Sequence, residues 1–249
     1  MKVLVGVDDT DTLESMGTGQ LSQIMVKEIE GKQWGNCSAV SRHQLFVHRD
    51  IPYTSHNSSM CFCIDFRGDL AALIDFGAGF LEERSATGSD PGLCVLPLGR
   101  GCAWKQLIDF GKRAKTEVLS KGIAYDLAED LGVHLSEHGG TGDGVIGALA
   151  GIGLRLSGND GRFRGWGRFG AMGTVSTVQT LCAEGYIDGV QTVDGVDLDP
   201  LTPIMLGADK VKTMLSYNRR VVMVEKIDSG GKDDSVQWRT LTKREIRQY

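Results

Sequence analysis

Three aspartates and a threonine near the N-terminus form the most chemically distinctive stretch of the sequence. Asp8, Asp9, Thr10 and Asp11 directly follow the apolar run Val3-Leu4-Val5-Gly6-Val7. A short run of this kind is typical of a buried strand, so the carboxylates are expected where that strand ends. Such crowded carboxylates repel one another unless a cation or a basic side chain lies among them. Asp8, Asp9 and Asp11 therefore predict Mg²⁺ or phosphate chemistry, although they also fit a solvated turn capped by an aspartate.

A glycine-rich segment, residues 139–144, is the second candidate. It reads Gly139-Gly140-Thr141-Gly142-Asp143-Gly144 and runs directly into the apolar stretch 145–153. Successive glycines can turn backbone N–H groups toward one point, and the N-terminus of the following helix adds partial positive charge. This pattern favours binding of a phosphate or another anion. The segment is neither a P-loop nor a Gly-x-Gly-x-x-Gly motif after a strand, and a loop in which Asp143 only caps the helix fits it equally well.

The two segments together predict a nucleotide site. A phosphate group needs both hydrogen-bond donors and a counter-cation, which a glycine loop and a carboxylate-bound Mg²⁺ supply in phosphoryl transfer. The segments are more than a hundred residues apart in the sequence, so the fold must bring them together. We therefore expect a cleft that takes ATP as substrate and Mg²⁺ as cofactor.

Segment 48–57 is the expected substrate-binding loop. It is rich in polar and titratable side chains and lies between two predicted strands, where loops commonly carry substrate contacts. The residues expected to contact substrate are Arg49, Tyr53, His56 and Asn57. Arg49 is suited to hold a phosphate and His56 to act as an acid or base, although each is also an ordinary surface residue type.

Hydrophobic spacing predicts the elements that must position these segments. The first strand is followed by predicted helices at 18–29, 69–81, 103–120 and 145–153, and by predicted strands at 37–48, 59–66 and 94–98. Through residue 98 the order is β-α-β-β-α-β, the ferredoxin-like split arrangement. Thr18 and Asp69 are predicted to cap the first two helices.

Beyond the glycine loop the pattern predicts a helix at 205–215 and strands at 221–227 and 236–241. The expected fold class is therefore α+β, with a ferredoxin-like lobe at residues 1–122 and a second α/β lobe at residues 123–249. Segment 162–169 is rich in arginine and aromatic residues; it fits a surface on which nucleotides stack or a partly buried loop.

Composition limits the classes of function. The 27 Lys and Arg against 32 Asp and Glu give a net charge of −5, so the whole chain lacks the basic character of a nucleic-acid binder. Six cysteines without a Cys-x-x-Cys pair argue against a zinc ribbon and for reduced thiols in a cytoplasmic protein. No signal-peptide pattern and no stretch long enough to span a bilayer is present, so no membrane partner is expected.

The sequence resembles the archaeal isoleucine-tRNA agmatinylcytidine synthetase family. The matching stretches are Gly6-Val7-Asp8-Asp9-Thr10-Asp11, Met16-Gly17-Thr18, Ile51-Pro52-Tyr53 and Ile146-Gly147-Ala148-Leu149-Ala150. The resemblance spans most of this chain but only the N-terminal, catalytic half of the family. Members usually carry Cys-Thr where Gly17-Thr18 stands in this chain.

This resemblance implies an enzyme that uses ATP to activate the base oxygen of a cytidine by phosphoryl transfer, before the amine agmatine displaces it. It implies that Asp8, Asp9 and Asp11 bind Mg²⁺ and phosphates, that Thr18 lies near the γ-phosphate, and that loop 139–144 contacts nucleotide. The family holds tRNA with an OB-fold and a zinc ribbon, of which this sequence has no counterpart. RNA is therefore expected as a partner only together with a separate RNA-binding protein.

The leading hypothesis is a Mg²⁺- and ATP-dependent transferase or ligase whose acceptor is a nucleoside, a small molecule or an RNA held by a partner. A non-catalytic nucleotide-binding sensor is one alternative. The other is a phosphatase of the haloacid-dehalogenase type, with Asp9 as nucleophile and Asp11 as acid, because Asp9-Thr10-Asp11 partly matches Asp-x-Asp-x-Thr. The match is partial because Thr12 stands one position before the place that the threonine of the motif would occupy.

Overall fold

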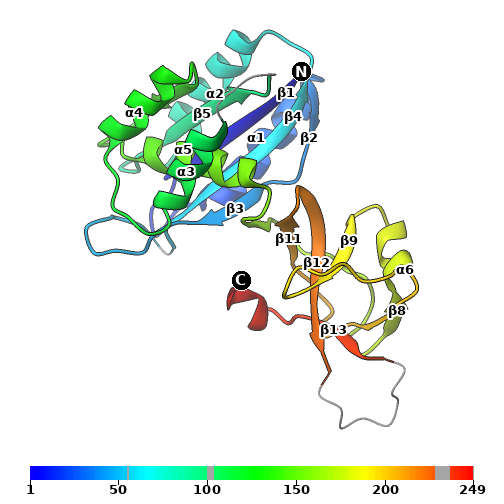
Figure 1. Cartoon of the computed structure of the whole chain (residues 1–249). Helices are drawn as coiled ribbons and strands as arrows, with labels where there is room; N and C mark the ends of the chain where they lie inside the picture. Colours follow the sequence, from blue (N-terminus) through cyan, green and yellow to red (C-terminus); the bar gives the residue numbers. More distant parts are fainter. Residues whose placement is uncertain (55, 100–103, 228–235, 249) are drawn as a thin grey trace. The chain divides into compact units, whose positions relative to one another are not determined.

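The structure is a computed structural model that describes residues 1–54, 56–99, 104–227 and 236–248. Two compact units divide the chain, Met1–Ser157 and Gly158–Tyr249. Each unit combines strands with helices, which confirms the expected α+β class (Figure 1). The boundary expected after residue 122 falls inside the first unit, at the start of helix α4 (Lys121–Asp130).

An antiparallel sheet forms the centre of the first unit. Its strand order is β6-β5-β1-β4-β3, and β2 also pairs with β4. The central strand β1 runs antiparallel to both neighbours, β4 and β5. The elements of this unit are β1 (Lys2–Asp8), α1 (Thr18–Gly31), β2 (Gly35–Cys37), β3 (Ser41–Gln44), β4 (Ser58–Phe66), α2 (Leu70–Arg84), β5 (Gly92–Pro97), α3 (Trp104–Arg113), α4, β6 (His134–Glu137) and α5 (Gly144–Ser157).

Helices cover both faces of this sheet. Val3, Val5 and Val7 of β1 pack with α1 and α2, whereas Leu4 packs with the layer of α3, α4 and α5, which Figure 1 draws in green on one side of the sheet. Because side chains alternate along a strand, Asp8 lies on the same side as Leu4. The last side chain of β1 is therefore directed toward the layer that contains α5.

Glycines allow α5 to lie very close to the sheet. A Cβ built on Gly6 would overlap the carbonyl of Ala148, one on Gly92 would overlap the backbone of Gly144, and one on Gly147 would overlap the carboxylate of Asp8. Only glycine permits such close backbone approach. The N-terminus of α5 is thereby held over the ends of β1 and β5.

The second unit has its own strands and core. Its strand order is β7-β11-β12-β13-β10-β8, with β9 parallel to β12. Ile204, Leu206, Val222 and Val224 are among its fully buried core residues. The elements are β7 (Arg162–Phe163), β8 (Val175–Thr177), α6 (Val178–Ala183), β9 (Gly189–Thr192), β10 (Pro203–Met205), β11 (Thr213–Ser216), β12 (Arg219–Lys226), β13 (Trp238–Thr240) and a 3-10 helix (Glu245–Gln248).

Three predicted elements differ from the structure. Two short strands, β2 and β3, stand where one strand was expected at 37–48. The helix expected to reach residue 120 ends at Arg113, where the Thr116 N–H donates to the Arg113 carbonyl at 2.9 Å and closes a turn; its predicted first residue, 103, lies outside the described residues. The prediction of a helix at 205–215 is wrong. The Gly207 N–H donates a hydrogen bond to Thr240 Oγ1 of β13 at 2.9 Å, rather than to a carbonyl of its own segment as in a helix.

One of the two predicted helix caps is confirmed. Asp69 caps α2, where its carboxylate accepts a hydrogen bond from Ala71 N–H at 3.2 Å. Gly17, rather than Thr18, is the N-cap of α1, and Thr18 is the first helical residue. Its hydroxyl is bound by the acidic loop, so it is not free to cap the helix.

Across the described part of the chain, none of the helices has both the length and the apolar character that crossing a membrane requires.

Candidate functional site

A cavity lies at the carboxyl end of β1. Four separate segments of the first unit line it, and five of the lining side chains are acidic: Asp8, Asp9, Asp50, Glu117 and Asp143. Among the described residues that line this cavity, none is Lys, Arg or His. The cavity therefore suits a ligand that is cationic or that brings a cation with it.

Asp8 is the most buried of these carboxylates. Its exposed fraction is 8%, because it packs against Gly147 of α5. Burial raises its pKa to about 8, and the neighbouring charge of Asp9 contributes to that rise. Asp8 is therefore largely protonated at neutral pH, and a nearby cation would favour its ionised form.

Asp9 turns the chain out of β1. It adopts a left-handed backbone conformation with φ of 52°, a region in which Asp is tolerated better than most residues. Burial raises its pKa to about 6, followed by the charges of Asp90, Asp11 and Asp143. Carboxylates from two distant segments, at Asp90 and Asp143, and from Asp11 of the same loop thus converge on Asp9.

Asp11 fixes Thr18 by a network of hydrogen bonds. Thr18 Oγ1 donates to Asp11 Oδ1 at 2.6 Å, and the Thr10 hydroxyl donates to Thr18 Oγ1 at 3.1 Å. On its other oxygen Asp11 accepts a bond from Thr54 Oγ1 at 3.1 Å. The acidic loop, the start of α1 and segment 48–57 are therefore joined at Asp11.

A second cavity also borders Asp9. Its lining includes Asp9, Asp11, Tyr53, Thr54 and Asp90. Asp9 and Pro52 line both cavities. Asp9 therefore borders both cavities.

The hydrogen-bond donors of the glycine loop are partly occupied. Gly139, Gly140 and Gly142 have positive φ, and α5 begins at Gly144. Both the amide and the hydroxyl of Thr141 donate to the Asp90 carboxylate, at 2.5 and 2.9 Å. Lys121 Nζ donates to the Thr141 carbonyl and, at 3.0 Å, to Glu137 Oε2. The loop thus already holds an anionic group, and its end at Asp143 and Gly144 reaches the first cavity.

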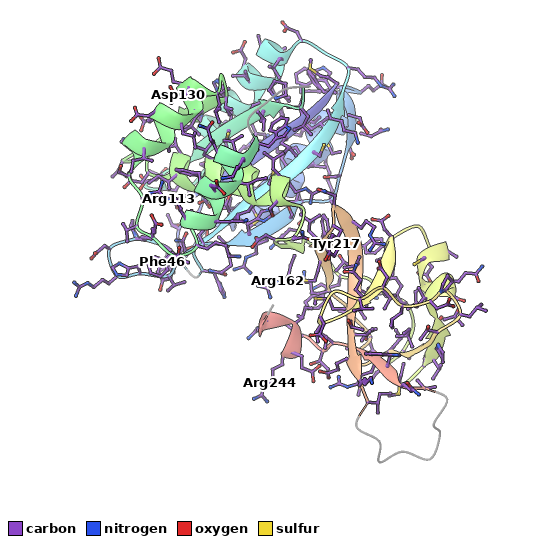
Figure 2. The ribbon with its side chains drawn as sticks, in the orientation of Figure 1. Phe46, Arg113, Asp130, Arg162, Tyr217 and Arg244 are labelled. Carbon is purple, nitrogen blue, oxygen red and sulfur yellow. The ribbon has the colours of Figure 1, made fainter. Side chains whose placement is uncertain are left out.

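The expected substrate residues in segment 48–57 separate into two groups. Asn57 lines the first cavity and its amide donates to the Phe46 carbonyl at 2.7 Å; Tyr53, 45% exposed, lines the second. Arg49 and His56 line neither of these cavities, and the Arg49 side chain is 89% exposed and lies 3.5 Å from Asp50. Figure 2 shows Phe46 near Arg113 of α3, consistent with the bond between Phe46 N–H and the Ala114 carbonyl.

The carboxylates of the site do not form a complete metal cage. Within the described ranges, no group of three or more His, Cys, Asp or Glu side chains is arranged to hold a metal ion. Mg²⁺, however, is commonly bound by one or two carboxylates together with substrate phosphates and water. Asp8 and Asp9 therefore fit a shared Mg²⁺–phosphate site better than an all-protein cage. The five described cysteines are free.

Sequence reasoning missed several residues of the site. Asp90 accepts a hydrogen bond from the glycine loop, and its charge raises the pKa of Asp9. Thr54 is hydrogen-bonded to Asp11, and Glu117 lines the first cavity. Asp90 precedes Pro91 just before β5, and its position beside Asp9 becomes evident only once β5 is known to pair antiparallel with β1. Glu117 lies in a stretch that was expected to be helical.

Comparison with known proteins gives structural relatives. No protein-family model matches the sequence, and no curated protein matches it either. The crystal structure of a tRNA fluorescent labeling enzyme is 27% identical over 61% of this chain and 36% of that chain, with a TM-score of 0.53. The complex of TiaS, a tRNA agmatidine synthetase, with its tRNA and ATP is 25% identical over 61% of this chain and 36% of that chain, with a TM-score of 0.54.

A third solved structure covers more of the chain. The complex of TiaS with tRNA, AMPCPP and agmatine matches 84% of this chain and 52% of that chain at 19% identity, with a TM-score of 0.53, which is a likeness of fold. The chain thus spans roughly a third to a half of the length of the structures that it matches. In structure it resembles part of an agmatidine synthetase, which confirms the resemblance seen in the sequence.

Proposed function

We propose that this chain is an ATP-using transferase or ligase that activates an acceptor by phosphoryl transfer. The observation that carries the proposal is the carboxylate-lined cavity at the end of β1, in which Asp8 and Asp9 have raised pKa values. This acidic lining, without a basic side chain, disfavours a bare phosphate, so a nucleotide is expected to enter with its cation. Two of the solved relatives hold ATP or AMPCPP, which supports this class of ligand.

Each residue then has a defined task. Asp8 and Asp9 would hold Mg²⁺, which when bound neutralises phosphate charge during transfer. Asp11 keeps the Thr18 hydroxyl at a fixed position through the 2.6 Å bond. The N-terminus of α5, at Gly144, adds partial positive charge beside the cavity, and the glycine loop holds Asp90 toward Asp9.

The acceptor is a nucleoside, a small molecule or an RNA delivered by a partner protein. The acidic lining, with Asp50 and Glu117 beside apolar Ile51 and Val118, also suits an amine as the attacking nucleophile. One structural relative holds agmatine together with tRNA and a nucleotide. An amine that carries a charged group and a short apolar chain is complementary to this lining.

Isothermal titration of ATP with Mg²⁺ tests the proposal. The wild-type protein is expected to bind Mg·ATP, and Asp9→Ala to bind it at least about tenfold more weakly, since a lost charge-assisted contact costs more than about 1.4 kcal/mol. Asp130→Asn, a change on the exposed end of α4 (Figure 2), is the matched control. Absence of binding, or equal binding by Asp9→Ala, contradicts the proposal.

Turnover separates the enzyme from a nucleotide sensor. The proposed enzyme consumes ATP in a screen of amines and nucleosides that includes its acceptor, whereas a sensor binds ATP without consuming it. The phosphatase alternative fits the fold poorly, because its parallel doubly wound sheet contrasts with a β1 that is antiparallel to both neighbours. Failure to trap a beryllium fluoride adduct on Asp9 would exclude it.

The first unit is proposed to be an elaborated ferredoxin-like arrangement. The antiparallel order β5-β1-β4-β3, with α1 and α2 packed on one face, supports this relation. Strand β6 and helices α3, α4 and α5 are then additions that build the cavity.

A further inference from the structure

A chain of hydrogen bonds outside both cavities runs along β6 to the residue that follows it. His134, Ser136 and His138 alternate in sequence, so their side chains share one face of the strand. Ser136 Oγ lies 2.9 Å from His134 Nε2 and 2.8 Å from His138 Nε2. On the other side of the His138 ring, Nδ1 lies 3.2 Å from Glu82 Oε1 of α2.

The order of these groups is that of an activated nucleophile. A hydroxyl bonded to one imidazole nitrogen, with a carboxylate on the other nitrogen, is the arrangement in which imidazole removes the hydroxyl proton. The His138 side chain is only 6% exposed, so its bond with Glu82 holds the ring in one orientation. Ser136 itself is half-buried, so the residue is not sealed in the core.

Helix α2 places two carboxylates near this chain of hydrogen bonds. The charge of Asp75 raises the pKa of His134, and Glu82 is hydrogen-bonded to His138. Asp75 and Glu82 therefore lie at the two ends of the α2 face that is directed toward β6. Gly79 lies between them at helical spacing. It is exposed, and a Cβ built on it would meet no heavy atom within 4 Å.

His134 completes the arrangement from the other side. Burial lowers its pKa, and the charge of His138 lowers it further, against the opposite effect of Asp75. A neutral His134 can donate its Nε2 proton to Ser136 Oγ while Ser136 donates to His138. The serine proton is thereby directed at the imidazole that Glu82 orients.

We propose that Ser136 is a nucleophile for acyl transfer, with His138 as its general base and Glu82 as the positioning residue, acting on small esters of neutral or cationic alcohols. The class of ester follows from the site. Asp75 and Glu82 disfavour an anionic substrate, and Gly79, which lies between them on α2, adds no side chain there.

The reaction balances with water as the only co-reactant. Ser136 Oγ bonds to the ester carbonyl carbon while its proton moves to His138 Nε2. The bond from that carbon to the alcohol oxygen then breaks, and the alcohol takes the proton from His138. Water attacks the acyl-serine, gives a proton to His138 and releases the carboxylic acid, and that proton returns to Ser136 Oγ.

Labelling of the full chain with a neutral alkyl fluorophosphonate tests the proposal, because Oγ displaces fluoride from phosphorus only when it is activated. The expected result is one label per chain, which peptide mapping by mass spectrometry places on Ser136, and a burst of p-nitrophenolate from p-nitrophenyl acetate. An unlabelled chain, or a label on another residue, overturns the proposal without recourse to any variant.

Variants then separate the roles. Ser136→Ala is expected to abolish labelling, and His138→Gln to slow it at least about 100-fold. Glu82→Ala is expected to slow it less and to recover partly in formate, which a purely structural tie between α2 and β6 would not show. Ser216→Ala, at a half-buried strand serine of the second unit, should leave labelling unchanged. Normal labelling in His138→Gln overturns the assignment of the base.

Discussion

The acidic loop and the glycine loop were expected to play complementary parts, yet the structure treats them differently. In the acidic loop, burial and mutual repulsion raise the pKa of Asp8 to about 8 and that of Asp9 to about 6. In the glycine loop, the Thr141 amide and hydroxyl are already bound by the Asp90 carboxylate. The carboxylates of the acidic loop lack a counter-charge, so their ionised forms are disfavoured. The donors of the glycine loop already bind a carboxylate.

This difference shows which loop a ligand must stabilise. A group whose charged form is disfavoured gains most when a cation arrives, whereas donors that already hold a carboxylate gain little from exchanging it for a phosphate. The glycines mainly allow close packing, because the absence of a Cβ at Gly144 and Gly147 lets α5 lie against β5 and Asp8. The comparison predicts large effects at Asp8 and Gly147 and small effects at Thr141 and Thr54.

The largest expected effect is the pH dependence caused by Asp8. Its folded pKa, about 8, lies above its ordinary value of 3.8, so its contribution to stability is complete below about pH 4 and is lost as the pH rises toward 8. Without ligand, the free energy of unfolding of the wild type should fall by about 3 to 5 kcal/mol relative to Asp8→Asn across this range. Urea melts at several pH values measure this difference. Parallel profiles for wild type and Asp8→Asn, with Asp130→Asn as the control, would contradict the account.

Gly147→Ala is expected to have the next largest effect. The new methyl group overlaps the Asp8 carboxylate, and such overpacking costs about 2 to 3 kcal/mol. Gly31→Ala is the matched control, since a Cβ at Gly31 meets nothing within 4 Å. Thermal melts should show a loss for Gly147→Ala alone, and the double variant Asp8→Ala/Gly147→Ala should regain most of it. Additive losses in the double variant would mean that the two residues do not contact each other.

Thr141→Val is expected to have a small effect. It removes the 2.9 Å hydroxyl bond to Asp90 and keeps the amide bond, at a cost of about 0.5 to 1 kcal/mol because Thr141 is exposed. The dissociation constant for Mg·ATP, measured by titration, should change less than about threefold. If Thr141→Val weakens binding as strongly as Asp9→Ala does, the glycine loop is the primary phosphate site and the comparison fails.

Thr54→Val is expected to have the smallest effect on stability, about 0.5 kcal/mol, because a half-buried hydroxyl loses one bond to Asp11. The change should show instead in segment 48–57. Arg49 is 89% exposed there, so trypsin should cut after it a few times faster once Thr54 no longer holds the segment. Thr116→Val, in the turn after α3, provides the control; equal cleavage rates would show that Thr54 does not hold the segment.

Local pattern predicted much of the first unit. Strand β1, its acidic exit, the Asp69 cap and the start of α5 after the glycine loop all follow from short-range spacing and turn chemistry. The helix expected at 205–215 fails because Gly207 is bound to β13, a partner distant in sequence. Asp90 was missed for a related reason. Its approach to Asp9 and Thr141 depends on β5 pairing beside β1 and on α5 lying over both, which no local pattern records.

The proton count on ligand binding tests the central claim most directly. At pH 7 Asp8 is largely protonated because its pKa is raised to about 8, and a cation bound with the nucleotide should ionise it. Titration of Mg·ATP in buffers of different ionisation enthalpy should therefore show release of about one proton per site by the wild type and far less by Asp8→Asn. Binding with no proton release, or with equal release by Asp8→Asn, would contradict the claim that these buried carboxylates receive the cation.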